Sequence, residues 1–379
     1  MMDKRIHLSL AHTSGFEEEY IRKAFSDNWI TSGGPNVDTF EEEIEAFLGE
    51  DVFVAGLNSG TSAVHLGLIL LDVKAGDEVI CQSLTFSASA NPIIYQGATP
   101  VFVDSESETW GICPEALEEA IKDRISKNKR PKAIIAVHLY GMPYKIDEVR
   151  EVADRYNIPI LEDSAEALGS TYKGKRCGTF GDLSVLSFNG NKIITTSSGG
   201  VLVTRSREFK EKAIFLSTQS REKRIHYEHT EIGYNYRMSN ICAGIGLGQI
   251  KVLDQYVSLR RNMHDFYVGL FSAIEGVSVF NEPTDDYRSN HWLSVIIVDP
   301  SKTKKHKDRD SLLLFLETLQ IESRPLWKPM HLQPIFEIYP YYGSNVAASL
   351  FEKGLCLPSG SNLTDEDRDR LESAIHKFF

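Results

Sequence analysis

The chain has 379 residues, of which 42% are hydrophobic and 25% charged, and its formal net charge is -12. This size and composition predict a folded, enzyme-sized protein with a main and a smaller domain, and they argue against extended disorder. The acidic balance excludes the broad basic surface that nucleic-acid binding requires, and the lysine-rich run 302–307 is interpreted as a solvated loop.

The cysteines and the N-terminus narrow the class further. The five cysteines are scattered and never in C-x-x-C spacing, so they indicate neither a disulfide framework nor a zinc site, and we expect no metal. Residues 1–19 lack the apolar core of a secretory signal, and no stretch reaches the length of a membrane span. We therefore expect a cytoplasmic protein.

Short β-rich runs alternate with helical stretches from about residue 52 to residue 204. This pattern is typical of an α/β fold with a mainly parallel sheet covered by helices. The predicted strands are 52–57, 78–82, 99–103, 133–137, 158–162, 184–187 and 201–204. Helices are expected to begin near Thr61, Ser87, Pro114, Ile146 and Glu208. Ligands of such sheets bind at the carboxyl ends of the strands, so the chemistry is sought in the loops that follow them.

The pattern changes beyond residue 240. A long helical stretch is predicted over 240–274, then a strand at 291–298 and helices near 308–319 and 364–379. We therefore expect a large domain over 1–240, which includes an N-terminal arm, and a linking helix with a small α+β domain over 241–379.

A possible phosphate site follows the first strand, at Asn58-Ser59-Gly60-Thr61-Ser62. Free N–H groups at a helix start, beside a glycine and hydroxyl groups, can bind a phosphate. Taken alone, the motif is more often an ordinary capped helix start.

An acidic motif follows a later strand, at Ile160-Leu161-Glu162-Asp163-Ser164-Ala165-Glu166. A carboxylate at Asp163 can pair with a protonated pyridine nitrogen and keep the ring electron-poor. The small Ala165 would let such a ring lie against the backbone, and Glu166 could reach its phenolic oxygen. Asp163 could equally cap the next turn.

The most informative stretch is 186–200, in which Lys192 lies in a loop that closes a strand and precedes two glycines. A lysine that forms a Schiff base must be desolvated yet free to swing, and Lys192 meets that demand. A single lysine is usually a surface residue, but the order of phosphate motif, acid and lysine is hard to explain in that way. The sequence predicts a pyridoxal-phosphate (PLP) enzyme of the aminotransferase type.

The sequence resembles the DegT/DnrJ-type sugar-nucleotide aminotransferases over nearly its whole length. The matching segments are Trp29-Ile30-Thr31-Ser32-Gly33-Gly34-Pro35, Asn58-Ser59-Gly60-Thr61, Glu162-Asp163-Ser164-Ala165-Glu166, Ser187-Phe188 with Lys192, and Gly233-Tyr234-Asn235-Tyr236-Arg237-Met238. The resemblance implies the fold of type I PLP enzymes, with a mainly parallel seven-stranded sheet, helices on both faces and a smaller C-terminal α+β domain.

The resemblance also implies roles for single residues. Gly60, Thr61 and Ser187 look like phosphate ligands, and Phe86 looks like the group that stacks on the cofactor ring. Without the resemblance, Phe86 would be read as a core aromatic. Asn235 is similar to a residue that reaches the phosphate from a neighbouring subunit, which implies a homodimer with shared active sites.

The reaction that the resemblance implies begins with L-glutamate as amino donor. Lys192, once displaced from the cofactor, would move a proton between the donor's α-carbon and the C4′ carbon of PLP. The pyridoxamine form would then aminate a keto-sugar attached to a nucleotide.

The subgroup most similar to this chain aminates the 4-keto carbon of a UDP-linked 2-acetamido-2,6-dideoxy sugar. The stretch 323–331 offers Arg324, Lys328 and His331 for a diphosphate or hydroxyl groups and Trp327 for stacking, although it could also be a structural loop bounded by prolines. Further substrate contacts are expected at Thr31 and Arg237. Many relatives carry an acidic residue where this chain has Ser198.

Three other classes of protein fit the sequence less well. A PLP-dependent sugar dehydratase on the same fold would replace the lysine by histidine, so Lys192 counts against it. A non-catalytic PLP or sugar sensor would not need both Lys192 and Asp163. A nicotinamide-dependent dehydrogenase fails because Gly244-Ile245-Gly246-Leu247-Gly248 lies in a helical stretch with no preceding strand.

Overall fold

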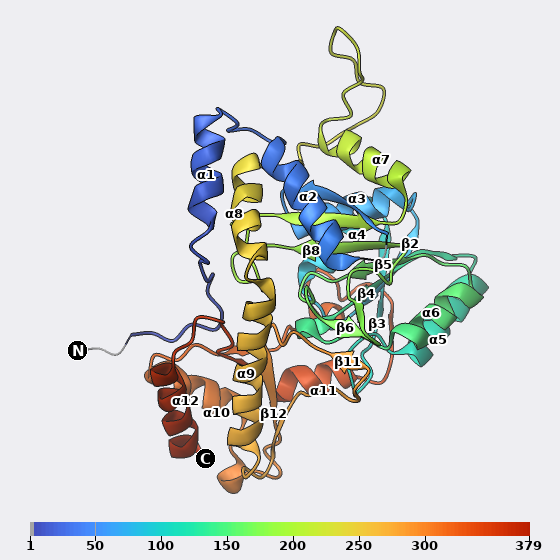
Figure 1. Cartoon of the computed structure of the whole chain (residues 1–379). Helices are drawn as coiled ribbons and strands as arrows, with labels where there is room; N and C mark the ends of the chain where they lie inside the picture. Colours follow the sequence, from blue (N-terminus) through green and yellow to red (C-terminus); the bar gives the residue numbers. More distant parts are fainter. Residues whose placement is uncertain (1–3, 50) are drawn as a thin grey trace.

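The computed structural model describes residues 4–49 and 51–379; residues 1–3 and 50, all within the expected large domain, lie outside the described residues. Its centre is an eight-stranded sheet in the order β1-β9-β8-β5-β4-β2-β3-β14 (Figure 1). The strands are β1 (Phe53–Leu57), β2 (Glu78–Gln82), β3 (Thr99–Val103), β4 (Pro131–Val137), β5 (Ile160–Asp163), β8 (Leu183–Ser187), β9 (Gly200–Thr204) and β14 (Tyr341–Tyr342).

The sheet is mainly parallel, as the sequence predicts. Neighbours from β8 through β5, β4, β2 and β3 to β14 run parallel, and only β9 pairs antiparallel with β8 and β1. All seven predicted strands are present, so the α/β fold class is confirmed. The eighth strand, β14, comes from the C-terminal region and was not predicted.

Helices cover both faces of the sheet. One face packs against α3 (Gly60–Leu70), α4 (Ser87–Tyr95) and α7 (Arg207–Ser217). The other face packs against α2 (Pro35–Leu48), α5 (Pro114–Ser126), α6 (Ile146–Arg155) and α8 (Asn240–Ile250), and α1 (Glu17–Ser26) lies along α8. Successive strand residues point to opposite faces, so Ile80 joins the core beneath α5 and α6 while Cys81 joins the core beneath α3 and α4.

The C-terminal region has a small sheet of its own, in the order β10-β12-β15-β13 (Val277–Val279, Ser294–Val298, Gly354–Leu357 and Arg324–Pro325). It packs with α9 (Leu253–Phe271), α10 (Arg309–Thr318) and α12 (Asp365–Phe378) around a core that also takes in Ile6 from the N-terminal arm. The predicted continuous helix over 240–274 is instead two helices, α8 and α9, which meet at Lys251 and Val252.

The remaining elements are short. A three-stranded sheet joins β6 (Thr171–Tyr172), β7 (Lys175–Arg176) and β11 (Tyr287–Arg288). Single turns of 3₁₀ helix form at η1 (Leu139–Gly141), η2 (Lys304–His306) and η3 (Met330–Leu332), and α11 (Val346–Lys353) precedes β15.

The short strand β14 fixes the C-terminal region to the large sheet. Tyr341 and Tyr342 pair in parallel with the end of β3. Just beyond β3, the Asp104 carboxylate accepts hydrogen bonds from the backbone N–H groups of Ser344, Val346 and Ala347, at 3.0, 2.8 and 2.9 Å. The strand and this cap together cover the carboxyl end of β3.

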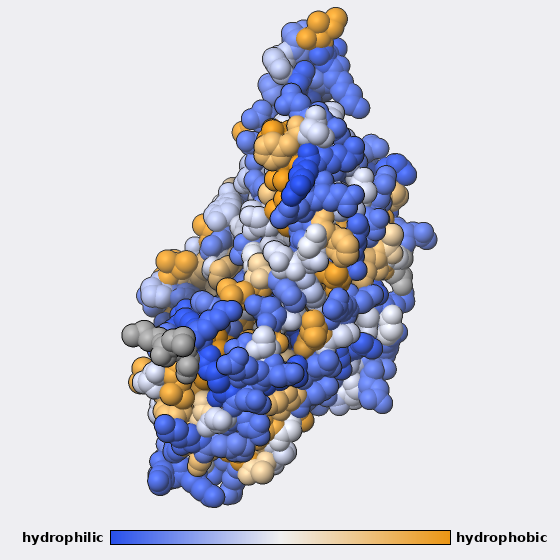
Figure 2. Space-filling model, turned by 60° about the vertical axis from the view of Figure 1, so that its left-hand side comes forward, coloured by the Kyte–Doolittle hydropathy of each residue, from blue (hydrophilic) through white to orange (hydrophobic). Residues whose placement is uncertain are grey.

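The segment between α7 and α8 projects from the body of the molecule, at the top of Figure 1. Its side chains include the exposed apolar residues Ile225, Tyr227 and Ile232, and Figure 2 shows apolar surface at the tip of the projection. Among the described residues, no helix is both long enough and apolar enough to cross a membrane.

Candidate active site

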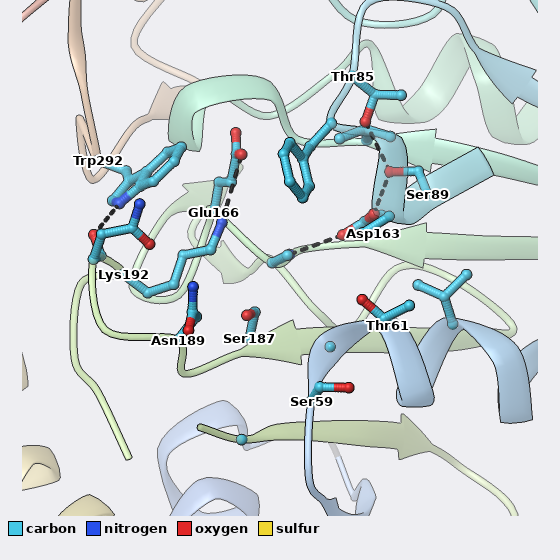
Figure 3. Close-up of a pocket in the computed structure, with 18 of the residues that line it drawn as sticks. Ser59, Thr61, Thr85, Ser89, Asp163, Glu166, Ser187, Asn189, Lys192 and Trp292 are labelled. Carbon is cyan, nitrogen blue, oxygen red and sulfur yellow. Dashed lines mark hydrogen bonds and ion pairs between the residues drawn. The ribbon is translucent and has the colours of Figure 1, made fainter. Parts of the chain in front are cut away.

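A cavity of about 320 Å³ lies at the carboxyl ends of β4, β5 and β8, where Val137, Asp163 and Ser187 form part of its wall. Ligands of parallel sheets bind at this edge. The wall contains eight of the nine predicted cofactor-binding residues: Gly60, Thr61, Phe86, Asp163, Ala165, Glu166, Ser187 and Lys192 (Figure 3).

The first turn of α3 forms one end of the cavity. Ser59 caps the helix by accepting a hydrogen bond from the N–H of Ser62, at 3.0 Å, so the ordinary capping role expected from the sequence is present. The first N–H groups of a helix have no acceptor within the helix. A Cβ at Gly60 would lie 3.0 Å from the Cβ of Ser187, and a Cβ at Gly200 would collide with the backbone nitrogen of Gly60. These glycines bring exposed N–H groups and a hydroxyl together, which suits a phosphate.

Asp163 ends β5, and its carboxylate is oriented by two donors. The Ser89 hydroxyl donates to it at 2.7 Å and the Ala165 N–H at 3.1 Å. The Ser89 oxygen is in turn 2.8 Å from the hydroxyl of Thr85. The hydrogen bond from the Ala165 N–H to Asp163 closes the local turn that the sequence offered as an alternative role for Asp163. A carboxylate has about four acceptor positions, so the two donors leave capacity for a ligand in the cavity.

Lys192 reaches into the cavity rather than into solvent. Its side chain is 14% exposed, and its Nζ is 3.5 Å from Oε1 of Glu166. Burial raises the pKa of Glu166, and Lys192 opposes that shift. The other oxygen of Glu166 accepts the backbone N–H of Tyr140 at 2.7 Å. The predicted lysine therefore shares one pocket with both predicted carboxylates.

Trp292 is a part of the wall that sequence reasoning missed. Its ring lies beside Lys192, with Nζ 4.1 Å from the ring centroid, and its Nε1–H donates to the carbonyl oxygen of Asn191 at 2.7 Å (Figure 3). Trp292 precedes β12 and comes from the C-terminal region. The sequence shows an aromatic residue there, but no spacing connects it to Lys192.

Phe86 and Trp327 form the aromatic side of the cavity. Phe86 is 52% exposed, and its ring centroid is 5.1 Å from that of Trp327. This exposure rules out the core-aromatic interpretation of Phe86. It leaves a ring face free at the mouth of the cavity.

A second hollow, of about 490 Å³, adjoins the cavity and shares Asn191, Trp292 and Trp327 with it. Arg324 and Lys328, both predicted substrate ligands, line this hollow. The Arg324 side chain is 65% exposed and donates to Glu322 at 2.8 Å. The two cations therefore lie beside the cavity rather than in it.

Two other predicted substrate residues lie outside both hollows. Thr31 is exposed, and its carbonyl oxygen accepts the N–H of Asn240 at 2.9 Å. Arg237 is buried in an ion pair with Glu41 and lies 3.8 Å from Asp38. The structure of the single chain therefore does not bring these two side chains to the site.

His331 and Asn235 are also outside the cavity. His331 is tied to the hydroxyl of Ser83, with Nδ1 at 2.7 Å, and stacks on Tyr341 with ring centroids 3.8 Å apart. Asn235 lies at the base of the projecting segment, where its carbonyl oxygen accepts a hydrogen bond from the Asn58 side chain at 3.2 Å. Asn235 is not among the residues that line the cavity of its own chain.

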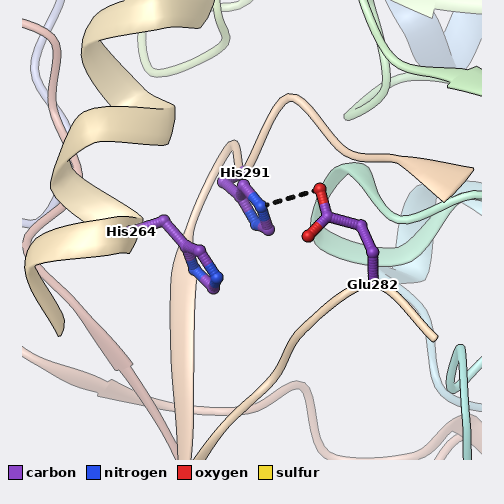
Figure 4. Close-up of side chains that lie close together, drawn as sticks. All are labelled: His264, Glu282 and His291. Carbon is purple, nitrogen blue, oxygen red and sulfur yellow. Dashed lines mark hydrogen bonds and ion pairs between the residues drawn. The ribbon is translucent and has the colours of Figure 1, made fainter. Parts of the chain in front are cut away.

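A separate cluster has the composition of a metal site (Figure 4). The ligand atoms of His264, Glu282 and His291 lie within 4.8 Å of one another. However, the two imidazoles stack face to face, with centroids 3.5 Å apart and planes at 4°, so their nitrogens cannot both point at one ion without turning. Arg261 also donates to the Glu282 carboxylate at 2.6 Å. We assign this cluster to holding the segment before β12 in place.

The sequence matches the DegT/DnrJ/EryC1/StrS aminotransferase family over residues 12–376. A similar protein of Bacillus subtilis (strain 168), "Putative pyridoxal phosphate-dependent aminotransferase EpsN", is 46% identical over 382 residues, which cover 100% of this chain and 97% of that protein. A GDP-perosamine synthase of Escherichia coli O157:H7 is 37% identical and covers 97% and 96% of the two chains. The solved structure of "Putative sugar aminotransferase Spr1654 from Streptococcus pneumoniae, PLP-form" is 26% identical, with a TM-score of 0.88 and 99% and 100% of the chains covered.

Proposed function

Since the chain belongs to the DegT/DnrJ/EryC1/StrS aminotransferase family, we propose that it moves an amino group from L-glutamate to the 4-keto carbon of a nucleotide-linked hexose. The chain is a PLP-dependent transaminase. The product would serve the biosynthesis of a cell-surface polysaccharide or glycan. The division into domains 1–240 and 241–379 and the cytoplasmic location stay predictions.

The cavity fits the phosphate of PLP at the start of α3. Gly60 and Thr61 would bind it through their backbone N–H groups, and Ser187 through its hydroxyl. The presence of Gly60, Thr61 and Ser187 in one wall of the cavity supports this assignment.

The ring of PLP would lie between Phe86 and Ala165, with Asp163 facing its nitrogen. When bound, PLP supplies an aldehyde that accepts the amino group and an electron-poor ring that stabilises negative charge at the donor's α-carbon. Asp163 would hold the proton on the ring nitrogen, and Ser89 keeps that carboxylate oriented. Glu166 would reach the phenolic oxygen.

Lys192 would hold PLP through Nζ and, once free, act as the base that moves the proton of the donor. The Lys192 side chain is largely buried and its Nζ lies beside Glu166, so the amine would stay close to a donor bound in the cavity. A base held in this way needs no diffusion to reach its proton.

The adjoining hollow would take the nucleotide part of the keto-sugar. Arg324 and Lys328 would bind the diphosphate and Trp327 would stack on the base. His331, which is tied to Ser83 outside this hollow, stays a predicted ligand without a contact to it. We propose a UDP-linked 2-acetamido-2,6-dideoxy sugar from the resemblance of the sequence. The GDP-perosamine synthase relative makes a GDP-linked sugar the second candidate.

We propose that the active enzyme is a homodimer in which Asn235 reaches the phosphate site of the other subunit. The exposed apolar side chains of the projecting segment support this arrangement, because such surface on a soluble protein usually marks an interface. Thr31 and Arg237 would approach substrate only if the second chain places them at its site.

One observation carries the proposal: Lys192 and Asp163 line the same cavity as the first turn of α3. The purified protein should be yellow, and borohydride should fix PLP on Lys192, as located by mass spectrometry of the digest. Attachment to another lysine would contradict the assignment.

The substrate is tested by incubating the enzyme with L-glutamate and a panel of UDP- and GDP-linked 3-keto and 4-keto sugars. Product NMR gives the position of the new amine, and a 3-amino product would correct the proposal. Loss of the 3-hydroxyl group without amino transfer would identify a dehydratase. Bound PLP with no turnover on any sugar would identify a sensor.

A further inference from the structure

Trp292 comes from the C-terminal region, and its side chain contacts Lys192 in the cavity. The indole is 1% exposed, its Nε1–H holds the carbonyl oxygen of Asn191, and its ring lies 4.1 Å from Nζ of Lys192. We propose that Trp292 is a positioning residue for Lys192, one that keeps the free amine inside the cavity whenever it is not attached to the cofactor. This inference rests on the proposed function.

The backbone around Trp292 is fixed to the same loop that carries Glu166. The N–H of Trp292 donates to Oδ1 of Asn290 at 2.8 Å, and Nδ2 of Asn290 donates to the carbonyl oxygens of Glu166 and Leu168, both at 2.9 Å. One buried amide therefore sets the distance between the indole and the carboxylate that flank the ammonium.

A second contact locks Asn290 in place. Its N–H donates to the hydroxyl of Ser170 at 2.9 Å, and that hydroxyl donates to the carbonyl oxygen of Gly141 at 2.6 Å. A Cβ at Gly141 would collide with Oδ1 of Asn290. The indole is thus held by a rigid set of contacts and not by general packing alone.

The physical effect expected of Trp292 is a cation–π attraction. An ammonium over an indole face gains enough to change its local population by between about 2-fold and about 30-fold, with the larger value for a desolvated pair. A released lysine side chain has four rotatable bonds and would otherwise sample the mouth of the cavity. The indole and Glu166 together restrict it to one place.

The decisive experiment nearly preserves the shape of the indole and weakens the attraction between its ring face and a cation. Fluorinated tryptophans with one to four fluorine atoms are placed at position 292 of the full-length protein, and in a control series at position 327, whose indole lines the same cavity. The labelling rate of Lys192 by acetic anhydride is then followed by mass spectrometry, both in the cofactor-free protein and in the form loaded with pyridoxamine phosphate.

The labelling rate should rise with each fluorine at position 292, by up to about 30-fold in total, and should stay within about 2-fold at position 327. An unchanged rate across the 292 series would overturn the proposal. Equal rises in the two series would also overturn it, because they would show only a looser cavity.

A second measurement tests the consequence for turnover. In the half-reaction with L-glutamate, the 292 series should lower the limiting rate constant while the glutamate concentration that gives half of this rate changes little. Trp292→Phe, which keeps a ring face, should retain more of the rate than Trp292→Leu. Equal rates for Phe and Leu would contradict a role for the ring. Borohydride attachment to Lys192 in every variant keeps the proposed function separate: if it fails in the unmodified enzyme, the proposed function fails first.

Discussion

Glu162 and Asp163 are consecutive residues of β5, and their carboxylates lie on opposite sides of the sheet. Among the residues that the structure describes, the Glu162 carboxylate accepts hydrogen bonds from six donors: His138, Ser164, Gly178, Phe180, Gly181 and Ser184. Within the same described part of the chain, Asp163 accepts from two donors, Ser89 and Ala165. Glu162, whose acceptor positions are all used, therefore stabilises the fold. Asp163 has acceptor positions left and is available to a ligand.

The difference is also electrostatic. Burial alone would raise the pKa of Glu162, but the hydrogen bonds from His138 and the other donors lower it to about 2. Glu162 therefore stays ionised in the interior because its surroundings are already complete. At Asp163, a bound cofactor would have to supply the hydrogen-bond donors that the protein itself does not provide.

The largest effect is expected from removing Glu162. In Glu162→Ala, three backbone N–H groups and the His138 ring lose their acceptor, and the free energy of unfolding should fall by about 3–5 kcal/mol. Urea denaturation measures this, and recovery of the variant only as insoluble protein would agree with it. Asp163→Ala is the matched control, with an expected loss below about 1.5 kcal/mol. Equal losses would break the comparison.

The difference in pH dependence between the wild type and Glu162→Gln should isolate the contribution of Glu162 to stability. Its pKa is lowered on folding, so its contribution is present above the unfolded value of 4.5 and is lost as the pH falls toward about 2. The wild type should lose up to about 3 kcal/mol between pH 5 and pH 2 from this group. Urea midpoints at several pH values should fall less steeply in Glu162→Gln. Parallel curves would contradict the assignment.

In the cavity, Asp163→Asn should lower the reactivity of the bound cofactor and leave the stability of the fold nearly unchanged. The amide can still accept from Ser89 but cannot hold a proton on the ring nitrogen, so the glutamate half-reaction should slow by about 100-fold, or about 2.7 kcal/mol. The unfolding free energy should change by less than about 1 kcal/mol. Stopped-flow absorbance and urea denaturation together check this. A stable, fully active variant would remove Asp163 from the site.

The smallest effect is expected at Asn235 and tests whether a second chain contributes to the phosphate site of the cavity. Asn235→Ala should weaken PLP retention by about 10-fold, near the lower end of what one hydrogen bond to a charged group contributes. Mixing this variant with Lys192→Ala should restore one intact site in each hybrid dimer, and retention should return in proportion to the hybrids. Unchanged retention in Asn235→Ala would contradict the shared site.

The strands were predictable wherever a short apolar run in the sequence forms a buried strand of the sheet. The bounds of β2 and β3 match the prediction because each is a short apolar run followed by polar or turn residues. The strand β14 has only two half-buried residues, and its pairing partner β3 is more than 200 residues away, so no local pattern indicates it.

The site was predictable where motifs follow strands. The carboxyl ends of parallel strands meet at one edge, so Asp163 and Ser187 converge with Lys192. Trp292 was missed because its contact with Lys192 depends on how the C-terminal region docks. Arg237 lies in an ion pair with Glu41, a contact that its own motif does not specify.

The pairing of β14 with β3 bears on how the protein is made. Val103 ends β3 and Tyr342 ends β14, so 239 further residues must be synthesised after Val103 before β14 is complete. At the usual pace of a ribosome this takes roughly 12–48 s. During that time the nascent sheet carries an exposed strand edge, which is a template for association with other chains. A fragment that stops at residue 240 would keep this edge bare permanently, and we expect it to elute as aggregates in size-exclusion chromatography.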